Sequence, residues 1–247
     1  MATVDIVIPV YNEEHTLPRS VDTLTDFLRE NLENPWTVTI ADNGSTDGTP
    51  GVGKMLSHKY DGVKYVHIPE KGRGRALRYM WTASDADIVS YMDVDLSTDL
   101  SHFPELVRAI EDGAHIATGS RLAKGAQVTR SLKREFISRC YSALFRLMFF
   151  TPFRDAQCGF KALRRDTAKS LLPLVKDNGW FFDSEMLIIG ARNGFRIREL
   201  PVRWEDDPDS RVRIVSTAWT DLKGLLRLRF GGIPRTAAEG DGGNGAG

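Results

Sequence analysis

The sequence predicts an α/β fold, with a Rossmann-like, open and mainly parallel sheet covered by helices on both faces. Through the first half of the chain, short apolar runs alternate with helical patterns, which is typical of parallel strands joined by helices. Polar residues follow several of these runs, at the edge where such sheets bind ligands. A chain of 247 residues can also bury a large core, as one domain with or without an extension.

Five strands are predicted, each a run rich in apolar and β-branched residues. They span residues 4–10, 36–41, 63–67, 88–92 and 115–118. A helix is predicted after the first strand because Leu17, Val21, Leu24 and Leu28 recur at spacings of three and four. Helical segments are expected between the other strands. Residues 42–49 are too polar and too rich in glycine for the interior of an element, so they are predicted to be a loop.

Two carboxylates, Asp93 and Asp95, follow the fourth strand. If the chain stays extended there, side chains two residues apart project to the same side. Neighbouring carboxylates repel each other unless a proton or a cation lies between them. Their oxygens suit Mg²⁺ or Mn²⁺, so the pair predicts a site for a divalent ion that also holds a diphosphate. A solvated loop is the alternative for an isolated D-x-D.

Polar residues also follow the first two strands, at Asn12 and Asp42. In an open α/β sheet the carboxyl ends of neighbouring parallel strands form one edge, where ligands bind. Asn12, Asp42 and Asp93 are therefore expected to lie at the same edge. This convergence favours a ligand site over a solvated loop.

A loop rich in glycine and basic residues lies between the third and fourth strands, at residues 70–77. Small residues let backbone amides approach an anion, and the start of a helix adds favourable partial charge. Lys71, Arg73 and Arg75 would add side-chain charge. A plain entry into a helix is the alternative, because the loop lacks the G-x-G-x-x-G and G-K-[ST] patterns of nucleotide-binding loops.

Beyond residue 121 the alternation is predicted to stop, and two apolar segments with arginines follow. Residues 136–150 are apolar and aromatic, and residues 217–230 repeat this amphipathic character. Both are too short or too charged to span a bilayer, which takes about 20 apolar residues. Each fits a helix in a membrane interface, with apolar groups among acyl chains and arginines at lipid phosphates. A helix buried in an ordinary core is the alternative.

The formal net charge of zero hides an uneven distribution. Residues 1–118 contain 10 basic and 19 acidic residues, whereas residues 119–235 contain 23 basic and 12 acidic residues. The basic second half predicts an anionic partner such as phosphate, a lipid surface or nucleic acid, although a solvated surface would have the same composition. The apolar segments beside the arginines favour lipid over nucleic acid.

The sequence lacks the marks of a secreted or membrane-spanning protein. Its first residues lack the basic and apolar regions of a signal peptide, and no stretch has the length of a transmembrane helix. Cys140 and Cys158 are its two cysteines, which argues against a disulfide framework or a cysteine zinc site. We therefore expect a protein of the cytosol, a reducing compartment.

Five motifs, taken in order and spacing, resemble family-2 glycosyltransferases of GT-A fold. They are residues 8–14, 42–49, 71–74, 93–96 and 119–121. Within that family the chain resembles the polyprenyl-phosphate (dolichyl-phosphate) hexosyltransferases. Residues 155–161, 180–185 and 200–204 are similar to the dolichyl-phosphate glucosyltransferase branch in particular. The resemblance covers about residues 3–230, and the chain departs from many relatives in lacking a transmembrane helix at either end.

The resemblance implies a division of the chain. Residues 1–215 would form the GT-A domain, with a nucleotide-binding half up to about residue 118 and an acceptor-binding half from about residue 119. Residues 216–230 would form an amphipathic interfacial helix. Residues 231–247, which are rich in glycine, are predicted to be a disordered tail.

The resemblance also implies roles for positions on the donor side. Pro9, Tyr11, Glu13 and Asp42 would line the nucleotide pocket, with Asp42 contacting the base. Lys71 would lie near the base or the diphosphate.

Other positions would act on the diphosphate, the metal and the acceptor. Asp93 and Asp95 would serve the ribose and the metal, with Asp95 as the more direct ligand of Mg²⁺ or Mn²⁺. Arg121 and Arg134 match basic positions that hold the acceptor phosphate. Arg211 matches a basic position that faces the donor diphosphate.

The implied reaction moves a hexose, with glucose favoured, from a nucleotide diphosphate sugar to polyprenyl phosphate with inversion. It would take place at the cytoplasmic face of a membrane, with peripheral attachment and no nucleic acid. A phosphate monoester is already ionised near neutral pH, with a second pKa of about 6, so a catalytic base is not obligatory. We therefore assign Asp183, the obvious candidate for a base, to donor-sugar hydroxyls or the acceptor pocket, and predict Asp93, Asp95 and Asp183 as catalytic. A residue that stabilises a helix N-terminus is the alternative for Asp183.

Three other functions remain open at this stage. The first is a GDP-mannose-dependent polyprenyl-phosphate mannosyltransferase. The second is a family-2 transferase that acts on a saccharide hydroxyl, which would need an essential base. The third is a sugar-nucleotide binding module without catalysis.

Overall fold

The structure is a computed structural model that describes residues 1–206 and 214–236. Its strands are β1 (Val4–Val10), β2 (Trp36–Asn43), β3 (Val63–Ile68), β4 (Ile88–Met92), β5 (Ile116–Ser120), β6 (Gln127–Thr129), β7 (Phe160–Arg164), β8 (Ile197–Pro201) and β9 (Arg203–Glu205). Its α-helices are α1 (Leu17–Asn31), α2 (Thr49–Lys59), α3 (Arg73–Ala83), α4 (Phe103–Glu111), α5 (Leu132–Phe149), α6 (Arg165–Leu171), α7 (Phe182–Arg192) and α8 (Ile214–Gly231). Short 3-10 helices, η1 (Leu100–His102) and η2 (Leu172–Leu174), precede α4 and follow α6.

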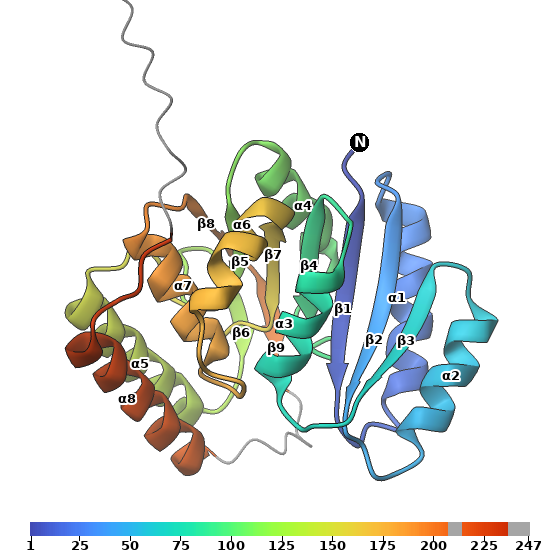
Figure 1. Cartoon of the computed structure of the whole chain (residues 1–247), viewed down its shortest axis with the longest axis horizontal. Coiled ribbons are helices and arrows are strands. Elements are labelled where there is room, and N and C mark those ends of the chain that lie inside the picture. The colour runs from blue at the N-terminus through green and yellow to red at the C-terminus, as the bar shows by residue number, and fades with distance from the viewer. Residues whose placement is uncertain (207–213, 237–247) are drawn as a thin grey trace, which may run out of the picture.

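A seven-stranded sheet in the order β3-β2-β1-β4-β7-β5-β8 runs through the centre of the molecule (Figure 1). Its strands pair in parallel, except that β7 runs antiparallel to its neighbours β4 and β5. β6 and β9 form a separate two-stranded ribbon. The prediction of an open, mainly parallel sheet is therefore confirmed.

All five predicted strands are present as β1 to β5, with bounds within two residues of those predicted. The prediction that the alternation stops after residue 121 is wrong, because β7 and β8 complete the large sheet. β7 contains Lys161, and a lysine argues against a fully buried strand. The side chain of Lys161 is nevertheless completely buried, because Asp183 lies 3.3 Å from its Nζ and balances its charge.

Helices cover both faces of the sheet, as predicted. Ile6, Ile8 and Ile40 project from one face and pack with α1, α2 and α4. Val89 and Tyr91 project from the other face and pack with α3, α6 and α7. The alternation of side chains along each strand thus divides the core into two layers.

The C-terminal helix α8 lies beside α5 at one end of the molecule (Figure 1). It buries Leu225 and Leu228 in the layer that contains α7. A Cβ atom at Gly224 would lie 2.3 Å from the ring of Phe181, so only glycine allows this close approach. Residues 216–230, expected to form an amphipathic interfacial helix, lie within α8, and one side of this helix belongs to the core. Its place in a membrane interface stays a prediction.

The chain after α8 returns to the end of α7. The side-chain amide of Asn193 donates to the carbonyl of Pro234 at 2.9 Å, and its oxygen accepts from the amide of Thr236 at 2.9 Å. The tail predicted to be disordered begins at residue 231, and its first part, residues 231–236, is held by these contacts. Residues 237–247 lie outside the described residues. Among the helices of residues 1–206 and 214–236, none combines the length and apolar character needed to cross a bilayer.

Candidate active site

The carboxyl ends of β1, β2 and β4 meet at one edge of the sheet, because β1 pairs in parallel with both other strands. The loops that follow β1 and β2 are bonded to each other. The amide of Asn12 donates to Ser45 Oγ at 2.9 Å, and its side-chain oxygen accepts from the amide of Thr46 at 2.8 Å. Asn12, Asp42 and Asp93 therefore lie at the same edge, as predicted.

The acidic pair follows β4 in a tight turn. The amide of Leu96 donates to the carbonyl of Asp93 at 3.1 Å, and Leu96 has a left-handed φ of 51°. The expectation that the chain stays extended here is wrong, because the strand ends at Met92. The two carboxylates nevertheless share a pocket, which is lined by Met92, Asp93, Asp95, Leu96, Ser97, Thr98, Gly159 and Trp204.

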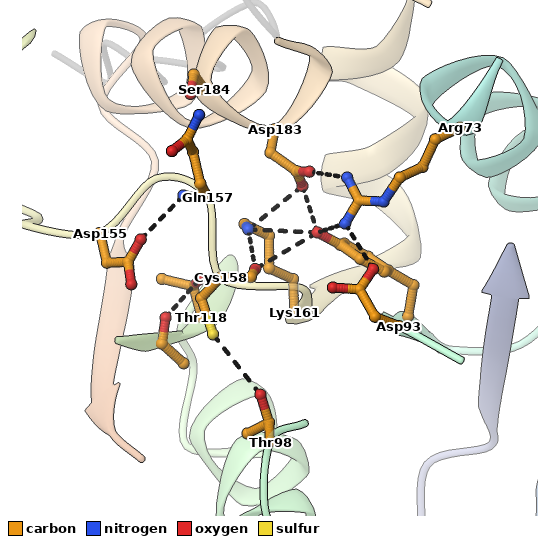
Figure 2. A network of polar contacts seen from close by, with 12 residues as sticks. Arg73, Asp93, Thr98, Thr118, Asp155, Gln157, Cys158, Lys161, Asp183 and Ser184 are labelled. Carbon is orange, nitrogen blue, oxygen red and sulfur yellow. Dashed lines mark hydrogen bonds and ion pairs between the residues drawn. The ribbon is translucent and has the colours of Figure 1, made fainter. Parts of the chain in front are cut away.

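A buried ionic network lies beside this pocket (Figure 2). Arg73, from the start of α3, donates through Nη1 to Asp183 and through Nη2 to Asp93 Oδ1 at 3.0 Å. The hydroxyl of Tyr91 accepts from Arg73 Nη2 at 2.9 Å and donates to Asp183 Oδ1 at 2.6 Å. Lys161 Nζ lies 3.3 Å from the same Asp183 oxygen. Two cations thus face two carboxylates around one phenol.

Burial and charge act against each other at Asp183, which is 1% exposed. Burial raises its pKa, but Lys161, Arg73 and the hydrogen bond from Tyr91 outweigh this effect and hold the pKa below its usual range. The pKa of Tyr91 is raised well above its usual value, chiefly by burial. Asp183 is therefore a stable carboxylate, which makes it a weak proton acceptor.

Asp93 is held from two sides. Its backbone amide donates to the carbonyl of Gly159 at 3.1 Å, and Arg73 binds one of its carboxylate oxygens. A Cβ atom at position 159 would lie 1.7 Å from the other oxygen, Oδ2. Glycine at 159 is therefore what makes room for the Asp93 carboxylate.

Asp93 and Asp95 are the carboxylates that the sequence predicts for a divalent ion. Within the part of the chain that the structure describes, no cluster of three or more His, Cys, Asp or Glu side chains is arranged for a metal. Two carboxylates fit an ion that takes its other ligands from a diphosphate and water, which is how Mg²⁺ is commonly bound. Arg73 holds the Asp93 carboxylate at Oδ1, and its Oδ2 lies against Gly159.

Asp42 is completely buried under side chains of β3. Its Oδ2 accepts from the hydroxyl of Tyr65 at 2.7 Å and lies 3.0 Å from Nδ1 of His67, and its Oδ1 accepts from the amide of Ser45 at 2.9 Å. Burial raises its pKa, but these hydrogen bonds together hold it below the usual range. Asp42 thus lies in the expected place with both oxygens engaged.

The other positions expected at the nucleotide lie around the same edge. Pro9 is buried within β1, and Tyr11 is partly exposed in the loop that follows. Lys71 Nζ lies 3.6 Å from the centroid of the Tyr11 ring, a cation–π contact. The amide of Glu13 donates to Thr49 Oγ1 at 2.8 Å. Tyr11 and Lys71 thus form one surface beside Asp42.

The glycine-rich loop proves to be an entry into a helix. The amide of Gly72 donates to Asn43 Oδ1 at 3.1 Å, and the amide of Arg75 donates to the carbonyl of Asn178 at 3.2 Å. A Cβ atom at Gly74 would lie 2.5 Å from Cβ of Phe182. Two amides expected to face an anion are therefore used inside the protein, and Gly74 allows α3 to pack closely on α7.

Arg121 and Arg134, expected at the acceptor phosphate, are both paired with carboxylates. Arg121 donates through Nε and Nη2 to Asp155 at 2.7 and 3.0 Å. Burial raises the pKa of Asp155, but the charge and hydrogen bonds of Arg121 outweigh this effect and hold the pKa below its usual range. Arg134 pairs with Asp206. Each arginine would therefore meet a phosphate as half of an ion pair, which weakens its attraction for the phosphate.

Trp204 connects Arg121 to the acidic pocket. The guanidinium of Arg121 lies 5.4 Å from the centroid of the Trp204 ring, and Trp204 lines the pocket of Asp93 and Asp95. Arg121 thus adjoins a side chain that lines the pocket of the two carboxylates. Arg211 lies outside the described residues.

Sequence reasoning gave no role to Tyr91, Lys161 or Asp155. The sequence predicts Tyr91 only as a strand residue, which agrees with its burial. Lys161 and Asp155 act as partners of other charges. A charge buried in the protein needs an opposite charge beside it, and here Lys161 pairs with Asp183 and Asp155 pairs with Arg121. Such pairings join residues far apart in the chain, which spacing alone does not reveal.

Comparisons with known proteins agree with this fold. The model of the family described as "Glycosyl transferase family 2" matches residues 5–172. The chain is 39% identical over 218 residues to the glycosyltransferase AglD of Haloferax volcanii. The matched region covers 86% of this chain and 34% of that protein. It is 30% identical over 219 residues to the dolichyl-phosphate beta-glucosyltransferase ALG5A of Trichomonas vaginalis, with 85% and 68% of the two chains covered. The chain thus spans about a third of one relative and two thirds of the other.

Solved structures show the same fold. Glucosyl-3-phosphoglycerate synthase from Mycobacterium tuberculosis, in complex with Mn²⁺, UDP and glucosyl-3-phosphoglycerate, superposes with a TM-score of 0.70 at 20% identity, covering 94% of this chain and 81% of that one. This likeness confirms the predicted GT-A fold. The family match over residues 5–172 shows that the chain belongs to glycosyltransferase family 2.

Proposed function

We propose that the protein transfers a hexose, with glucose favoured, from a nucleotide diphosphate sugar to polyprenyl (dolichyl) phosphate, with inversion at the anomeric carbon. The names of its relatives support this acceptor, since ALG5A and the enzyme of Saccharomyces cerevisiae are dolichyl-phosphate beta-glucosyltransferases. The second of these is 25% identical over 245 residues. The attacking atom would be a phosphate oxygen, and the nucleoside diphosphate would leave.

The observation that supports a phosphate acceptor best is the state of Asp183. Attack by a sugar hydroxyl requires a group that removes its proton in the transition state. Asp183 is bound by Arg73, Tyr91 and Lys161, and its pKa is held below the usual range. A carboxylate so stabilised is a poor base. A phosphate monoester needs none, because it is largely ionised at neutral pH with a second pKa of about 6.

On the donor side, Asp93 and Asp95 would hold Mg²⁺ or Mn²⁺. When bound, the ion would supply Lewis-acid stabilisation of the diphosphate leaving group. Arg73 fixes Asp93 and Asp183 relative to each other, since it donates to both. Tyr11 and Lys71 would border the nucleotide, and Asp42 would fix Tyr65 beside the base. The buried network therefore sets the geometry before the substrate binds.

On the acceptor side, Arg121 and Arg134 would bind the phosphate while paired with Asp155 and Asp206. An ion pair still presents oriented N–H donors, because each guanidinium has five of them in a fixed plane. The paired carboxylates would limit how strongly a doubly charged phosphate is retained. Arg211, outside the described residues, keeps its predicted role beside the donor diphosphate.

The lipid would be reached from an apolar stripe on α5 and its C-cap, defined by Leu132, Phe136, Leu144, Leu147 and Phe150. All five are exposed. The spacing of the first four, by four, eight and three residues, places them on one side of the helix, and Phe150 follows its last turn. On the neighbouring helix α8, Trp219, Leu226 and Phe230 are exposed as well. Apolar side chains on adjoining helices, with exposed arginines among them, fit the interface of a membrane with anionic lipid. We therefore include peripheral attachment at the cytoplasmic face in the proposal.

Removing apolar side chains from the stripe is expected to weaken membrane binding. In the double variant Phe136→Ser and Leu147→Ser, two residues that are 69% and 74% exposed lose their apolar groups. Full burial of such side chains contributes about 1.5–3 kcal/mol each, so affinity for vesicles should fall more than about tenfold. The affinity is measured by sedimentation of each protein with vesicles of phosphatidylcholine and phosphatidylglycerol.

The control is the double variant Met55→Ser and Tyr79→Ser, on α2 and α3, where the side chains are 49% and 58% exposed. It removes similar exposed groups away from the stripe and should bind vesicles like the unchanged protein. Equal losses in the two variants would contradict a membrane surface at α5.

Gly159→Ala is expected to impair catalysis without unfolding the protein. The new methyl group would displace the Asp93 carboxylate from its place beside the cation site, and a shift of about 1 Å at reacting groups can cost about 100-fold in rate. Gly51→Ala on α2 is the matched control, because nothing lies within 4 Å of its Cβ position. Measured kcat should fall only for Gly159→Ala. A retained kcat would show that Asp93 need not be held in this place.

The proposal is tested by donor and acceptor panels. The purified protein is incubated with Mn²⁺ or Mg²⁺, a short polyprenyl phosphate, and labelled UDP-glucose, UDP-galactose or GDP-mannose. Labelled glucosyl lipid is the expected product. If mannosyl lipid formed instead, the proposed sugar would be wrong but the reaction class would stand. Transfer only to saccharide acceptors would contradict the proposed acceptor.

A further inference from the structure

Trp180 is an exposed tryptophan at the rim of the buried ionic network. Its side chain is 46% exposed, although the two residues that follow, Phe181 and Phe182, are completely buried. The guanidinium of Arg73 lies 5.0 Å from the centroid of the Trp180 ring and 4.8 Å from that of Tyr91. The indole of Trp180 therefore packs against Arg73, and the rest of its surface is exposed to solvent.

The backbone beside Trp180 is fixed by hydrogen bonds. The buried carboxylate of Glu185 accepts from the amides of Lys176 and Asp177 at 3.1 and 2.7 Å. The carbonyl of Asn178 accepts from the amide of Arg75 at 3.2 Å. The loop that presents the indole is thus bonded to both α7 and α3.

Arg78 adds a third attachment to this loop, since its Nη2 donates to the carbonyls of Val175 and Asp177 at 2.7 and 2.9 Å. Exposing a large apolar ring has no stabilising effect on the fold by itself. A ring exposed on a fixed backbone, with two buried phenylalanines as its anchor, is well suited to binding a ligand. It provides a flat apolar surface at little cost in conformational entropy.

The position of Trp180 indicates which part of the substrate it would meet. Arg73 contacts both Trp180 and Asp93, so the indole is one side chain away from the cation site that would hold the diphosphate. The hexose is the group joined directly to that diphosphate. The nucleotide base would lie elsewhere, at Tyr11 and Asp42.

A pyranose ring has an apolar face of C–H groups and a polar edge of hydroxyls. The indole of Trp180 matches the face, and the guanidinium of Arg73, 5.0 Å from the centroid of that ring, is a polar group beside it that matches the edge. We propose that Trp180 stacks on the hexose of the donor and so selects the sugar and its orientation. This inference rests on the proposed function for the class of donor, and it names a residue for the sugar itself.

The test compares ligands with and without the sugar. Binding of UDP, UDP-glucose, GDP and GDP-mannose, each with Mn²⁺, is measured by calorimetry for the unchanged protein, Trp180→Ala, Trp180→Phe and the control Tyr79→Ala. Of the two pairs, UDP with UDP-glucose and GDP with GDP-mannose, the one that binds is used for the comparison. Trp180→Ala should lower the affinity for the sugar nucleotide about tenfold, the order of an aromatic stacking contact. The affinity for the free nucleotide should change by less than about twofold. Trp180→Phe should recover part of the loss, and Tyr79→Ala, an aromatic residue that is 58% exposed on α3, should change neither.

The other outcomes overturn the inference in different ways. If Trp180→Ala lowered the affinities for the free nucleotide and for the sugar nucleotide equally, Trp180 would act through Arg73 and not on the sugar. Unchanged donor binding with a raised KM for polyprenyl phosphate would assign Trp180 to the acceptor. If the unchanged protein bound neither pair, the proposed donor class would fail, and the inference with it. Melting temperatures of the variants identify any that are unfolded.

Discussion

Asp95→Ala is expected to lower kcat about 1,000-fold or more while leaving the melting temperature nearly unchanged. Asp95 is exposed in the turn after β4 and lines the pocket that it shares with Asp93. A bound cation is worth several kcal/mol of transition-state stabilisation, and each 1.36 kcal/mol corresponds to about tenfold in rate. Steady-state assays over a range of Mn²⁺ concentrations measure the effect.

Asp85→Ala is the control for this prediction. The Asp85 side chain is fully exposed and lies before β4, at the opposite end of the strand from the site. Its removal should change neither kcat nor the dependence on Mn²⁺. If Asp95→Ala retained full activity at all metal concentrations, the assignment of the acidic pair to the cation would be wrong.

Asp183→Ala is expected to unfold more easily as well as to lose activity. Removing this carboxylate leaves the buried cations Arg73 and Lys161 with one partner fewer, and breaking a buried ion pair typically costs about 3–5 kcal/mol. Asp183→Asn keeps the shape and one hydrogen-bonding oxygen for Tyr91, so it should be destabilised less. Unfolding in urea measures both variants.

The dependence of stability on pH separates charge from packing at Asp183. Its pKa is held below the usual range in the folded state, so the unfolded state binds more protons there. This contribution to stability is complete above the pKa of the unfolded chain, about 3.9, and is lost as the pH falls through the lower, folded-state pKa. Below about pH 4 the unchanged protein should therefore lose stability more steeply than Asp183→Asn. Parallel curves would contradict the ionised state assigned to Asp183.

The network around Tyr91 gives these predictions a common basis. Arg73 joins Asp93, on the side of the cation, to Asp183, on the side of α7. Lys161 balances the second carboxylate. A charged site in which most groups are already paired reorganises little when a charged substrate binds, which is the condition for electrostatic catalysis.

Much of the fold could be predicted because its strands are uninterrupted apolar runs. β1 and β4 were recognised with their observed bounds, since both are buried along their whole length and are followed by polar residues. β7 was not predicted because its second residue, Lys161, contradicts the pattern of a buried strand. The balancing charge comes from a helix more than twenty residues later in the sequence.

The place of the site was also predictable, but its internal bonding was not. Parallel strands bring their carboxyl ends together, so the meeting of Asn12, Asp42 and Asp93 follows from topology. Whether an arginine is available for a phosphate depends on its partners in space. Arg121 and Arg134 match basic positions in the sequence, and only the structure reveals that Asp155 and Asp206 pair with them.

The proposed reaction requires that the acceptor arrives as an anion and that Asp183 never takes its proton. The most direct test offers the protein two acceptors that differ only in the phosphate: a short polyprenyl phosphate and the corresponding polyprenol, each with labelled UDP-glucose and Mn²⁺. The account predicts glucosyl transfer to the phosphate and none to the alcohol, and a rate that does not follow a titration of Asp183 between about pH 6 and 8. Transfer to the alcohol at a comparable rate would contradict it.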